Sequence, residues 1–365
     1  MTVVRVERLV TELHELDALL VTNMVNISYL TGFTGSNALV LVDADERTAH
    51  HRLYTDFRYA TQSAEQVPDV FAREIVTGEL LDAAVTGLVV AGGAGRLGFD
   101  DASLTVARHT RLRELLPPAW ELVPCPGAVE RLRAIKDAEE IARIRAASQL
   151  ADEALLRGVL ERGLVGRAER DVAIDLELEM RRHGADGPSF PSIVASGIHG
   201  ALPHAEPRAE PIPRDVLVTI DWGALHESYC SDCTRTYATG EGVSARAREV
   251  YELVRSAQAE AVTAVTAGPT GRELDGVARA AIERAGHGEH FGHGLGHGVG
   301  MEVHERPRLS RTSGEEPLQA GNVITIEPGV YLPGECGVRI EDLVVVRADG
   351  HEVLTGLSKE LTVIS

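Results

Sequence analysis

The chain of 365 residues carries 36 basic and 55 acidic residues, which gives a formal net charge of -19. This charge repels nucleic acid and anionic lipid, so we expect neither as a partner. The first ten residues lack the apolar core of a signal peptide, and no stretch approaches the roughly 18 apolar residues of a membrane span. The sequence therefore predicts a cytoplasmic protein without a membrane partner.

The first third of the chain reads as strands that alternate with helices. Short apolar runs with helical stretches between them are typical of a small α/β domain. The predicted strands lie at 18–21, 38–42 and 88–91.

A domain boundary is predicted near residue 130. The pattern breaks at Cys125-Pro126-Gly127, and a new helix begins at Asp137, three residues before Glu140, which is a capping-box spacing. A chain of this length favours about two domains. We therefore predict one domain over 1–130 and a second over 131–365.

The second domain reads as long helices plus a sheet. Its first helix shows apolar residues at helical spacing from Ile141 to Leu155 and must pack on something large. Further helices are predicted at 168–183, 244–267 and 270–286, the last with Thr270 and Glu273 as a capping pair. Strands are predicted at 193–195, 216–220, 323–326 and 337–346.

Two aspartates stand beside apolar runs. Asp221 ends the run Val-Leu-Val-Thr-Ile, and Asp232 follows eleven residues later. Taken singly, each is more often a cap or turn residue than a catalytic one. Cys230 and Cys233 flank Asp232 as a C-x-x-C, but on a strand this offset sends the two thiols to opposite faces, which disfavours a zinc or redox site.

A segment rich in histidine and glycine strengthens the case for a catalytic role of these aspartates. Five of the fourteen histidines occupy residues 287–304: His287, His290, His293, His297 and His304. Imidazole is the commonest neutral metal ligand, and interleaved glycines let the backbone approach a crowded site. The alternative is a surface loop with chance histidines, which the apolar residues between them disfavour.

Two glutamates complete the pattern. Glu327 and Glu341 are embedded in apolar runs, and a buried carboxylate must be paired or coordinated because its desolvation costs several kcal/mol or more. Arg339 shares a strand face with Glu341, so a simple ion pair is the alternative.

Charge arithmetic favours a centre with two metal ions. Four carboxylates contribute -4 and two divalent ions +4, and oxygen ligands with one imidazole suit Mn, Co or Zn. Two such ions about 3.5 to 4 Å apart lower the pKa of a bridging water towards about 7 and polarise a carbonyl.

These residues in this order resemble the pita-bread metallopeptidases, and most closely their aminopeptidase P and prolidase branch. The contexts are I-D-W-G, S-D-C-T-R-T, G-H-G-L-G-H-G-V-G-M-E-V-H-E, T-I-E-P-G-V-Y and V-R-I-E-D. Stretches at 29–36, 54–59, 190–197 and 203–204 also fit. His199 departs from the family, which often has Asn there, and this puts the substrate preference in doubt.

The resemblance implies a fold, an activity and a role for each site residue. The fold is α/β (α+β), with a creatinase-like N-terminal α/β domain followed by a pita-bread catalytic domain, usually in a homodimer or homotetramer. The activity is hydrolysis of the Xaa-Pro bond of a proline-containing peptide by two divalent ions, most simply Mn. The implied metal ligands are Asp221, Asp232, His297, Glu327 and Glu341. Glu327 would also accept the proton of the attacking water, His204 and His304 would hold the scissile carbonyl and the developing charge, and His293, Tyr331 and Arg339 would contact or position substrate.

Several alternatives stay open within this resemblance. An Xaa-Pro aminopeptidase is our first expectation, and an Xaa-Pro dipeptidase (prolidase) restricted to dipeptides is the alternative. Methionine aminopeptidase would not need the first 130 residues. A metal-free creatinase-like amidinohydrolase would lack the full ligand set, and a non-catalytic binding module would fail to bind metal.

Overall fold

Two structural units divide the chain, Met1–Arg133 and Ala134–Ser365. The structure is a computed structural model that describes residues 2–44, 50–90 and 94–365. Within these ranges, no helix is both long enough and apolar enough to cross a bilayer.

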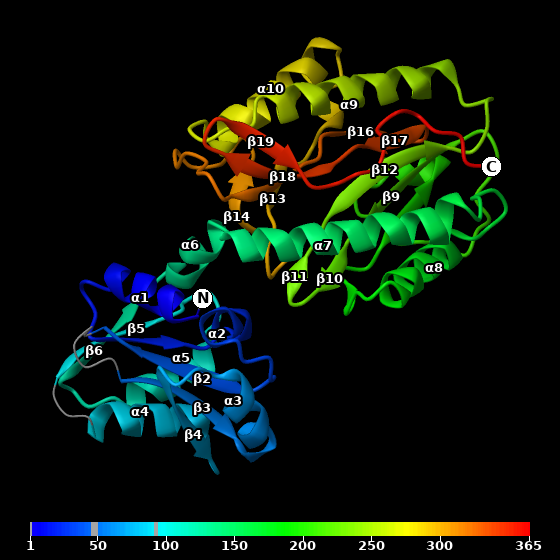
Figure 1. Ribbon diagram of the computed structural model, residues 1–365. Helices are drawn as coiled ribbons and strands as arrows, with labels where there is room; N and C mark the ends of the chain where they lie inside the picture. The colour runs from blue at the N-terminus through cyan, green and yellow to red at the C-terminus, as the bar shows by residue number, and fades with distance from the viewer. Residues whose placement is uncertain (1, 45–49, 91–93) are drawn as a thin grey trace. The chain divides into compact units, whose positions relative to one another are not determined.

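The first unit is built on a mixed sheet (Figure 1). Its strands are β1 (Ala18–Val21), β2 (Ala38–Asp43), β3 (His51–Asp56), β4 (Phe71–Val76), β5 (Gly95–Phe99) and β6 (Trp120–Pro124). Its helices are α1 (Thr2–Glu12), α2 (Met24–Thr31), α3 (Ala60–Gln66), α4 (Leu80–Val90), α5 (Val106–Leu115) and α6 (Ala128–Ala134). The strand order among the described residues is β4-β3-β2-β1-β5-β6, with β1 antiparallel to β2 and parallel to β5.

The strand predicted at 88–91 is wrong. Leu88 to Val90 form the end of helix α4, Ala91 lies outside the described residues, and the next strand is β5. The reason is that a short apolar run looks the same in a buried helix and in a buried strand, since periodicity cannot separate them over four residues.

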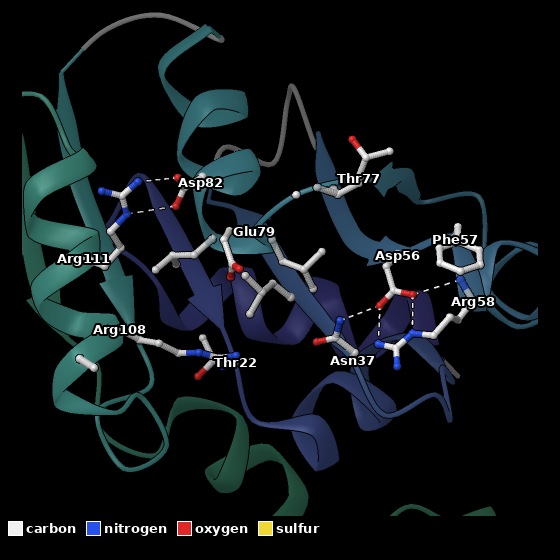
Figure 2. Close-up of a pocket in the computed structure, with 16 residues that line it drawn as sticks. Thr22, Asn37, Asp56, Phe57, Arg58, Thr77, Glu79, Asp82, Arg108 and Arg111 are labelled. Atoms are coloured by element: carbon white, nitrogen blue, oxygen red, sulfur yellow. Dashed lines mark hydrogen bonds and ion pairs between the residues drawn. The ribbon is translucent and has the colours of Figure 1, made fainter.

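A cavity of about 620 Å³ opens in the first unit where β1, β3 and β4 end (Figure 2). Two ion pairs lie in its wall, Asp56 with Arg58 at 2.8 Å and Asp82 with Arg111 at 2.6 Å. The charges of each pair neutralise one another. None of the predicted metal ligands lines this cavity.

The second unit contains four long helices and several short sheets. Its helices are α7 (Ala138–Leu155), α8 (Glu169–Arg182), α9 (Ala245–Thr263) and α10 (Gly271–Arg284), with the short 3-10 helices η3 (Gly197–Ala201) and η4 (Gly288–His290). Its strands are β7 (Gly187–Pro188), β8 (Ile193–Ser196), β9 (Leu217–Trp222), β10 (Ala224–His226), β11 (Tyr229–Cys230), β12 (Cys233–Ala238), β13 (Gly296–Gly298), β14 (Glu305–Leu309), β15 (Val323–Ile326), β16 (Gly329–Leu332), β17 (Cys336–Arg339), β18 (Asp342–Arg347) and β19 (Gly350–Val353).

The two helix pairs of this unit cover its strands from two sides (Figure 1). Helices α7 and α8 pack on the sheet β12-β9-β8, and α9 and α10 pack on strands of the sheet β14-β13-β15-β18-β19 and on the hairpin β16-β17. The capping boxes predicted at the starts of α7 and α10 are both present. They satisfy backbone N–H groups that each helix start would otherwise leave unpaired.

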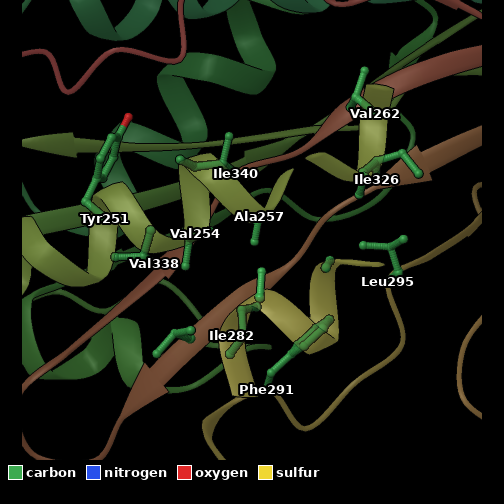
Figure 3. Packing of buried hydrophobic residues seen from close by; sticks show 14 of the residues in the cluster. Tyr251, Val254, Ala257, Val262, Ile282, Phe291, Leu295, Ile326, Val338 and Ile340 are labelled. Atoms are coloured by element: carbon green, nitrogen blue, oxygen red, sulfur yellow. The ribbon is translucent and has the colours of Figure 1, made fainter. Parts of the chain in front are cut away.

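Packing on α9 and α10 decides which way the site residues point. Ile326, Val338 and Ile340 are fully buried in a cluster with these helices (Figure 3). Because strand side chains alternate between faces, burying Val338 in β17 turns Arg339 to the opposite side. The single strand predicted at 337–346 is wrong in one respect, since Ile340 and Glu341 form a break between β17 and β18.

Asp152 on α7 offers a test of the buried electrostatics. Its Oδ2 accepts a hydrogen bond from the Gly356 backbone N–H at 2.7 Å, and among the described residues its buried Oδ1 has no partner. Burial raises the pKa of Asp152 to about 6, although Gly356 and Arg235 act in the opposite direction. The folded pKa lies above the unfolded value of about 3.9, so the folded protein gains stability as the pH falls from 7 through 6.

Asp152→Asn should therefore raise the free energy of unfolding by about 1 to 3 kcal/mol at pH 7.5. The gain should shrink as the pH falls through 6 and vanish only below about 3.9, where the carboxyl is protonated in the unfolded protein as well. Thermal unfolding midpoints at pH 7.5 and 4.5 measure both values, with Glu153→Gln, the next residue on the same helix, as the control. A gain of equal size at both pH values would contradict the assignment.

Candidate metal centre

Three carboxylates from separate strand ends converge in the second unit. Asp221 lies in β9, Asp232 in the turn before β12, and Glu341 between β17 and β18. Strand β12 pairs antiparallel with β9 and places Thr234 opposite Asp221. Each of the three acids offers one oxygen, and these oxygens lie within 4.8 Å of one another. Among the described residues, no other group of three His, Cys, Asp or Glu side chains is arranged to hold a metal ion.

Two oxygens of this cluster show that it fits a cation. Asp221 Oδ1 and Glu341 Oε1 are buried, and within the described part of the chain neither has a hydrogen-bond partner. Burial raises the pKa of Asp232 and of Glu341 well above the usual carboxyl range, and neighbouring carboxylates raise both further. A divalent ion would supply the missing ligand contacts and the opposing charge.

His297 and Glu327 form a second part of the same centre. His297 Nε2 lies 3.3 Å from Glu327 Oε1 and 3.7 Å from Asp232 Oδ2. Its Nδ1 donates to the Gly298 carbonyl oxygen at 3.1 Å, which leaves Nε2 facing the carboxylates. Burial opposes ionisation of Glu327, but the hydrogen bond and charge of His297 lower its pKa to about 2.

Arg339 is buried beside the cluster and contacts three groups of the site. Its Nη2 donates to Asp221 Oδ2 at 2.7 Å, and its Nη1 donates to the Tyr331 hydroxyl at 2.9 Å and to the Pro203 carbonyl at 3.1 Å. The ion pair that we considered between Arg339 and Glu341 is replaced by the pair with Asp221. Arg339 therefore holds Asp221 in place through Oδ2, while the other carboxylate oxygen of Asp221, Oδ1, faces the cluster.

A hydrogen-bonded chain runs from Arg339 through Tyr331 to His293. Because Arg339 can only donate, the Tyr331 hydroxyl accepts from it and donates to His293 Nε2 at 2.9 Å. His293 Nδ1 lies 2.8 Å from the Gly294 carbonyl and donates to it. Both ring nitrogens are thereby fixed, and burial lowers the pKa of His293, so the ring is neutral.

His304 and His204 stand close to this chain. The rings of His304 and His297 meet edge to face with centroids 4.3 Å apart. Burial lowers the pKa of His304, and the charges of His297 and His204 contribute in the same direction. His204 follows Pro203, whose carbonyl accepts from Arg339.

Two histidines of the glycine-rich segment lie elsewhere. His287 Nδ1 is 3.2 Å from His290 Nδ1, and the guanidinium of Arg246 donates to His287 Nε2 at 3.1 Å. Cys230 and Cys233 are buried as thiols, and they donate to the carbonyls of Met301 and Glu341 respectively.

Two threonines of the centre escaped the sequence analysis. The Thr234 hydroxyl accepts from Arg339 Nε at 3.0 Å and donates to Glu341 Oε2 at 2.7 Å. The Thr325 hydroxyl accepts from the His297 backbone N–H and lies 3.2 Å from Glu327 Oε1. Each stands two residues from an acid, Asp232 or Glu327, and the period-two alternation of strands is the signal that would have found them.

Family models match both units. The model of metallopeptidase family M24 matches residues 142–348, and that of the Creatinase/Prolidase N-terminal domain matches residues 5–135. The chain belongs to metallopeptidase family M24. It is a metal-dependent hydrolase, and M24 metallopeptidases use a dinuclear divalent metal centre. The predicted fold class, a creatinase-like α/β domain followed by a pita-bread catalytic domain, is confirmed.

Relatives of the M24 family match over nearly the whole chain. An Xaa-Pro dipeptidase from Pyrococcus furiosus is 37% identical over 363 residues, which cover 98% of this chain and 99% of the relative. The structure of an Xaa-Pro dipeptidase from Bacillus anthracis superposes with a TM-score of 0.94 at 38% identity and covers 100% of both chains. An X-Pro aminopeptidase from Thermotoga maritima has a TM-score of 0.89 at 34% identity and covers 99% of this chain and 100% of its own.

Proposed function

We propose that this protein hydrolyses the Xaa-Pro peptide bond with two divalent metal ions, and that its substrates are dipeptides. The observation that carries the proposal is the convergence of Asp221, Asp232 and Glu341 within 4.8 Å beside His297 and Glu327. The two Xaa-Pro dipeptidases that resemble the chain support the substrate class.

The ligands that we assign to the two ions are Asp221, Asp232, His297, Glu327 and Glu341. When bound, two such ions acidify a water molecule and polarise the scissile carbonyl. We propose Mn as the metal, with Co or Zn as alternatives, because a set of oxygen ligands with one imidazole suits these ions.

The other residues of the centre act on the substrate. Glu327 accepts the proton of the attacking water, because its Oε1 lies at the centre, 3.3 Å from His297 Nε2. His204 and His304 donate to the scissile carbonyl as negative charge develops on it. The chain from Arg339 through Tyr331 fixes the ring of His293, which we assign to the pocket that receives proline.

The dipeptidase alternative is better supported than the aminopeptidase that the sequence led us to expect first. Relatives named Xaa-Pro dipeptidase match the chain at 37% and 38% identity over nearly its whole length. The X-Pro aminopeptidase of similar fold keeps the other specificity open to experiment. We also propose that the protein is a homodimer or homotetramer and that it lies in the cytoplasm.

The test of this function is to strip the protein of metal, add Mn, Co or Zn, and measure peptide hydrolysis. We expect metal-dependent cleavage of Ala-Pro, with Ala-Pro-Ala and Ala-Ala poor substrates. Proline lacks an amide N–H and its ring fixes the backbone, so a site built for it serves Ala-Ala badly. Preference for Ala-Pro-Ala would restore the aminopeptidase, and no turnover with any metal would favour a creatinase-like enzyme or a binding module.

A further inference from the structure

A buried carboxylate outside the metal centre collects an unusual number of hydrogen bonds. Glu169, at the first turn of α8, has no exposed surface. It accepts two hydrogen bonds from Ser196, at 2.8 Å from the backbone N–H and 2.6 Å from the hydroxyl. It accepts three from Arg208, from the backbone N–H and the guanidinium, at 3.1 to 3.2 Å. His199 Nδ1 lies 2.9 Å away.

These partners are the two ends of one segment. Ser196 is the last residue of β8, and Arg208 lies at the far end of the segment that follows η3. Between them lie Pro203, whose carbonyl accepts from Arg339, and His204, which we assign to the scissile carbonyl. The side chain of Glu169 therefore fixes both ends of the segment 196–208, which lines one side of the metal centre.

The middle of this segment rests on the strand that carries Arg339. A Cβ added to Gly337 in β17 would lie 1.8 Å from the Gly200 carbonyl oxygen, so the two backbones touch and leave no room for a side chain. With its ends held by Glu169 and its middle seated on β17, the segment 196–208 has little freedom to move His204.

The electrostatics of Glu169 suit a fixed anchor. Burial acts against ionisation, but the donors of Arg208 and Ser196 outweigh it and lower the pKa of Glu169. The positive end of the α8 dipole favours the same charged form. His199, which stands where the family often has Asn, points its Nδ1 at this carboxylate.

We propose that Glu169 is a positioning residue that sets His204 against the substrate by fixing the segment 196–208. The inference rests on the proposed function through the role of His204. The alternative is that Glu169 only stabilises the fold. Another buried glutamate of the chain provides a matched control for this alternative. Glu179 on the same helix is 6% exposed and accepts from Arg162 and Arg182, but it does not touch the segment.

Glu169→Gln tests the proposal, because it keeps the shape but turns an N–H₂ group towards donors. We expect kcat on Ala-Pro to fall by about 10- to 100-fold, as is typical of groups that orient a metal or catalytic side chain, with KM and metal content little changed. Glu179→Gln should keep kcat. Equal losses of kcat in both variants would overturn the proposal. If Glu169→Gln does not fold, Glu169→Asp replaces it in the same measurements.

A double-mutant cycle separates positioning from stability. If Glu169 acts through His204, adding Glu169→Gln to His204→Ala should cost little further rate, whereas independent effects would multiply. Multiplying losses would overturn the proposal.

Imidazole NMR of metal-free protein labelled in histidine gives a readout that needs no turnover. Glu169→Gln should shift the His204 signal, assigned with His204→Ala, and Glu179→Gln should not. An unmoved signal would refute the positioning role, whereas an inactive unmodified enzyme would count only against the proposed function.

Discussion

Glu341→Ala should abolish turnover of Ala-Pro by the metal-loaded protein. The variant removes one of the three carboxylates whose oxygens lie within 4.8 Å of one another, together with an oxygen that no other described group satisfies. Losing a metal ligand should cost more than the roughly 10²- to 10³-fold that follows removal of one oxyanion-hole donor. Measurement of kcat together with metal content per chain checks this, and both should fall.

A neighbouring acid provides the control for this experiment. Glu335 lies in the turn between β16 and β17, close in sequence to Glu341, and its side chain is exposed. Glu335→Ala should keep both activity and metal. Asp232→Ala should behave as Glu341→Ala does, and near-normal activity in either of these ligand variants would refute the two-metal assignment.

His304→Ala should retain the metal and lose rate. Its ring packs edge to face on His297, but we assign it to the substrate carbonyl and not to the ligand set. Removing one donor to the developing charge costs about 10²- to 10³-fold in kcat. The ratio of metal to protein should equal that of the unmodified enzyme, measured in the same preparation as kcat.

His290→Ala is the matched control, because His290 belongs to the same glycine-rich segment and faces His287. It should leave both metal and rate unchanged. If His304→Ala instead released metal, His304 would be a ligand and the set assigned here would need revision.

Local sequence patterns predicted the helices of the second unit well, because their signals are local. The capping pairs at Asp137 and Thr270 mark helix starts through contacts three residues apart, and both capping boxes form. The apolar run at 88–91 misled because four residues hold too little periodicity to separate helix from strand.

The five residues predicted as ligands come together because each stands in or beside a strand of the second unit. Their supporting contacts could not be read from local patterns. Glu169 meets Ser196 and Arg208 across 27 and 39 residues, and Thr234 meets Glu341 across 107. Such pairs depend on how strands are ordered in the sheets, which period and composition do not encode.

Asp221 and Glu341 each have a buried oxygen without a partner in the described part of the chain, and these oxygens also affect the lifetime of the protein. Like charges crowded in a dry interior oppose folding until a cation joins them, so the metal is a folding ligand as well as a reagent. An ion present at 100 times its dissociation constant adds about 2.7 kcal/mol to the free energy of unfolding. A chelator should therefore lower the thermal midpoint, and a cell short of metal should degrade the protein faster and hold fewer copies of it.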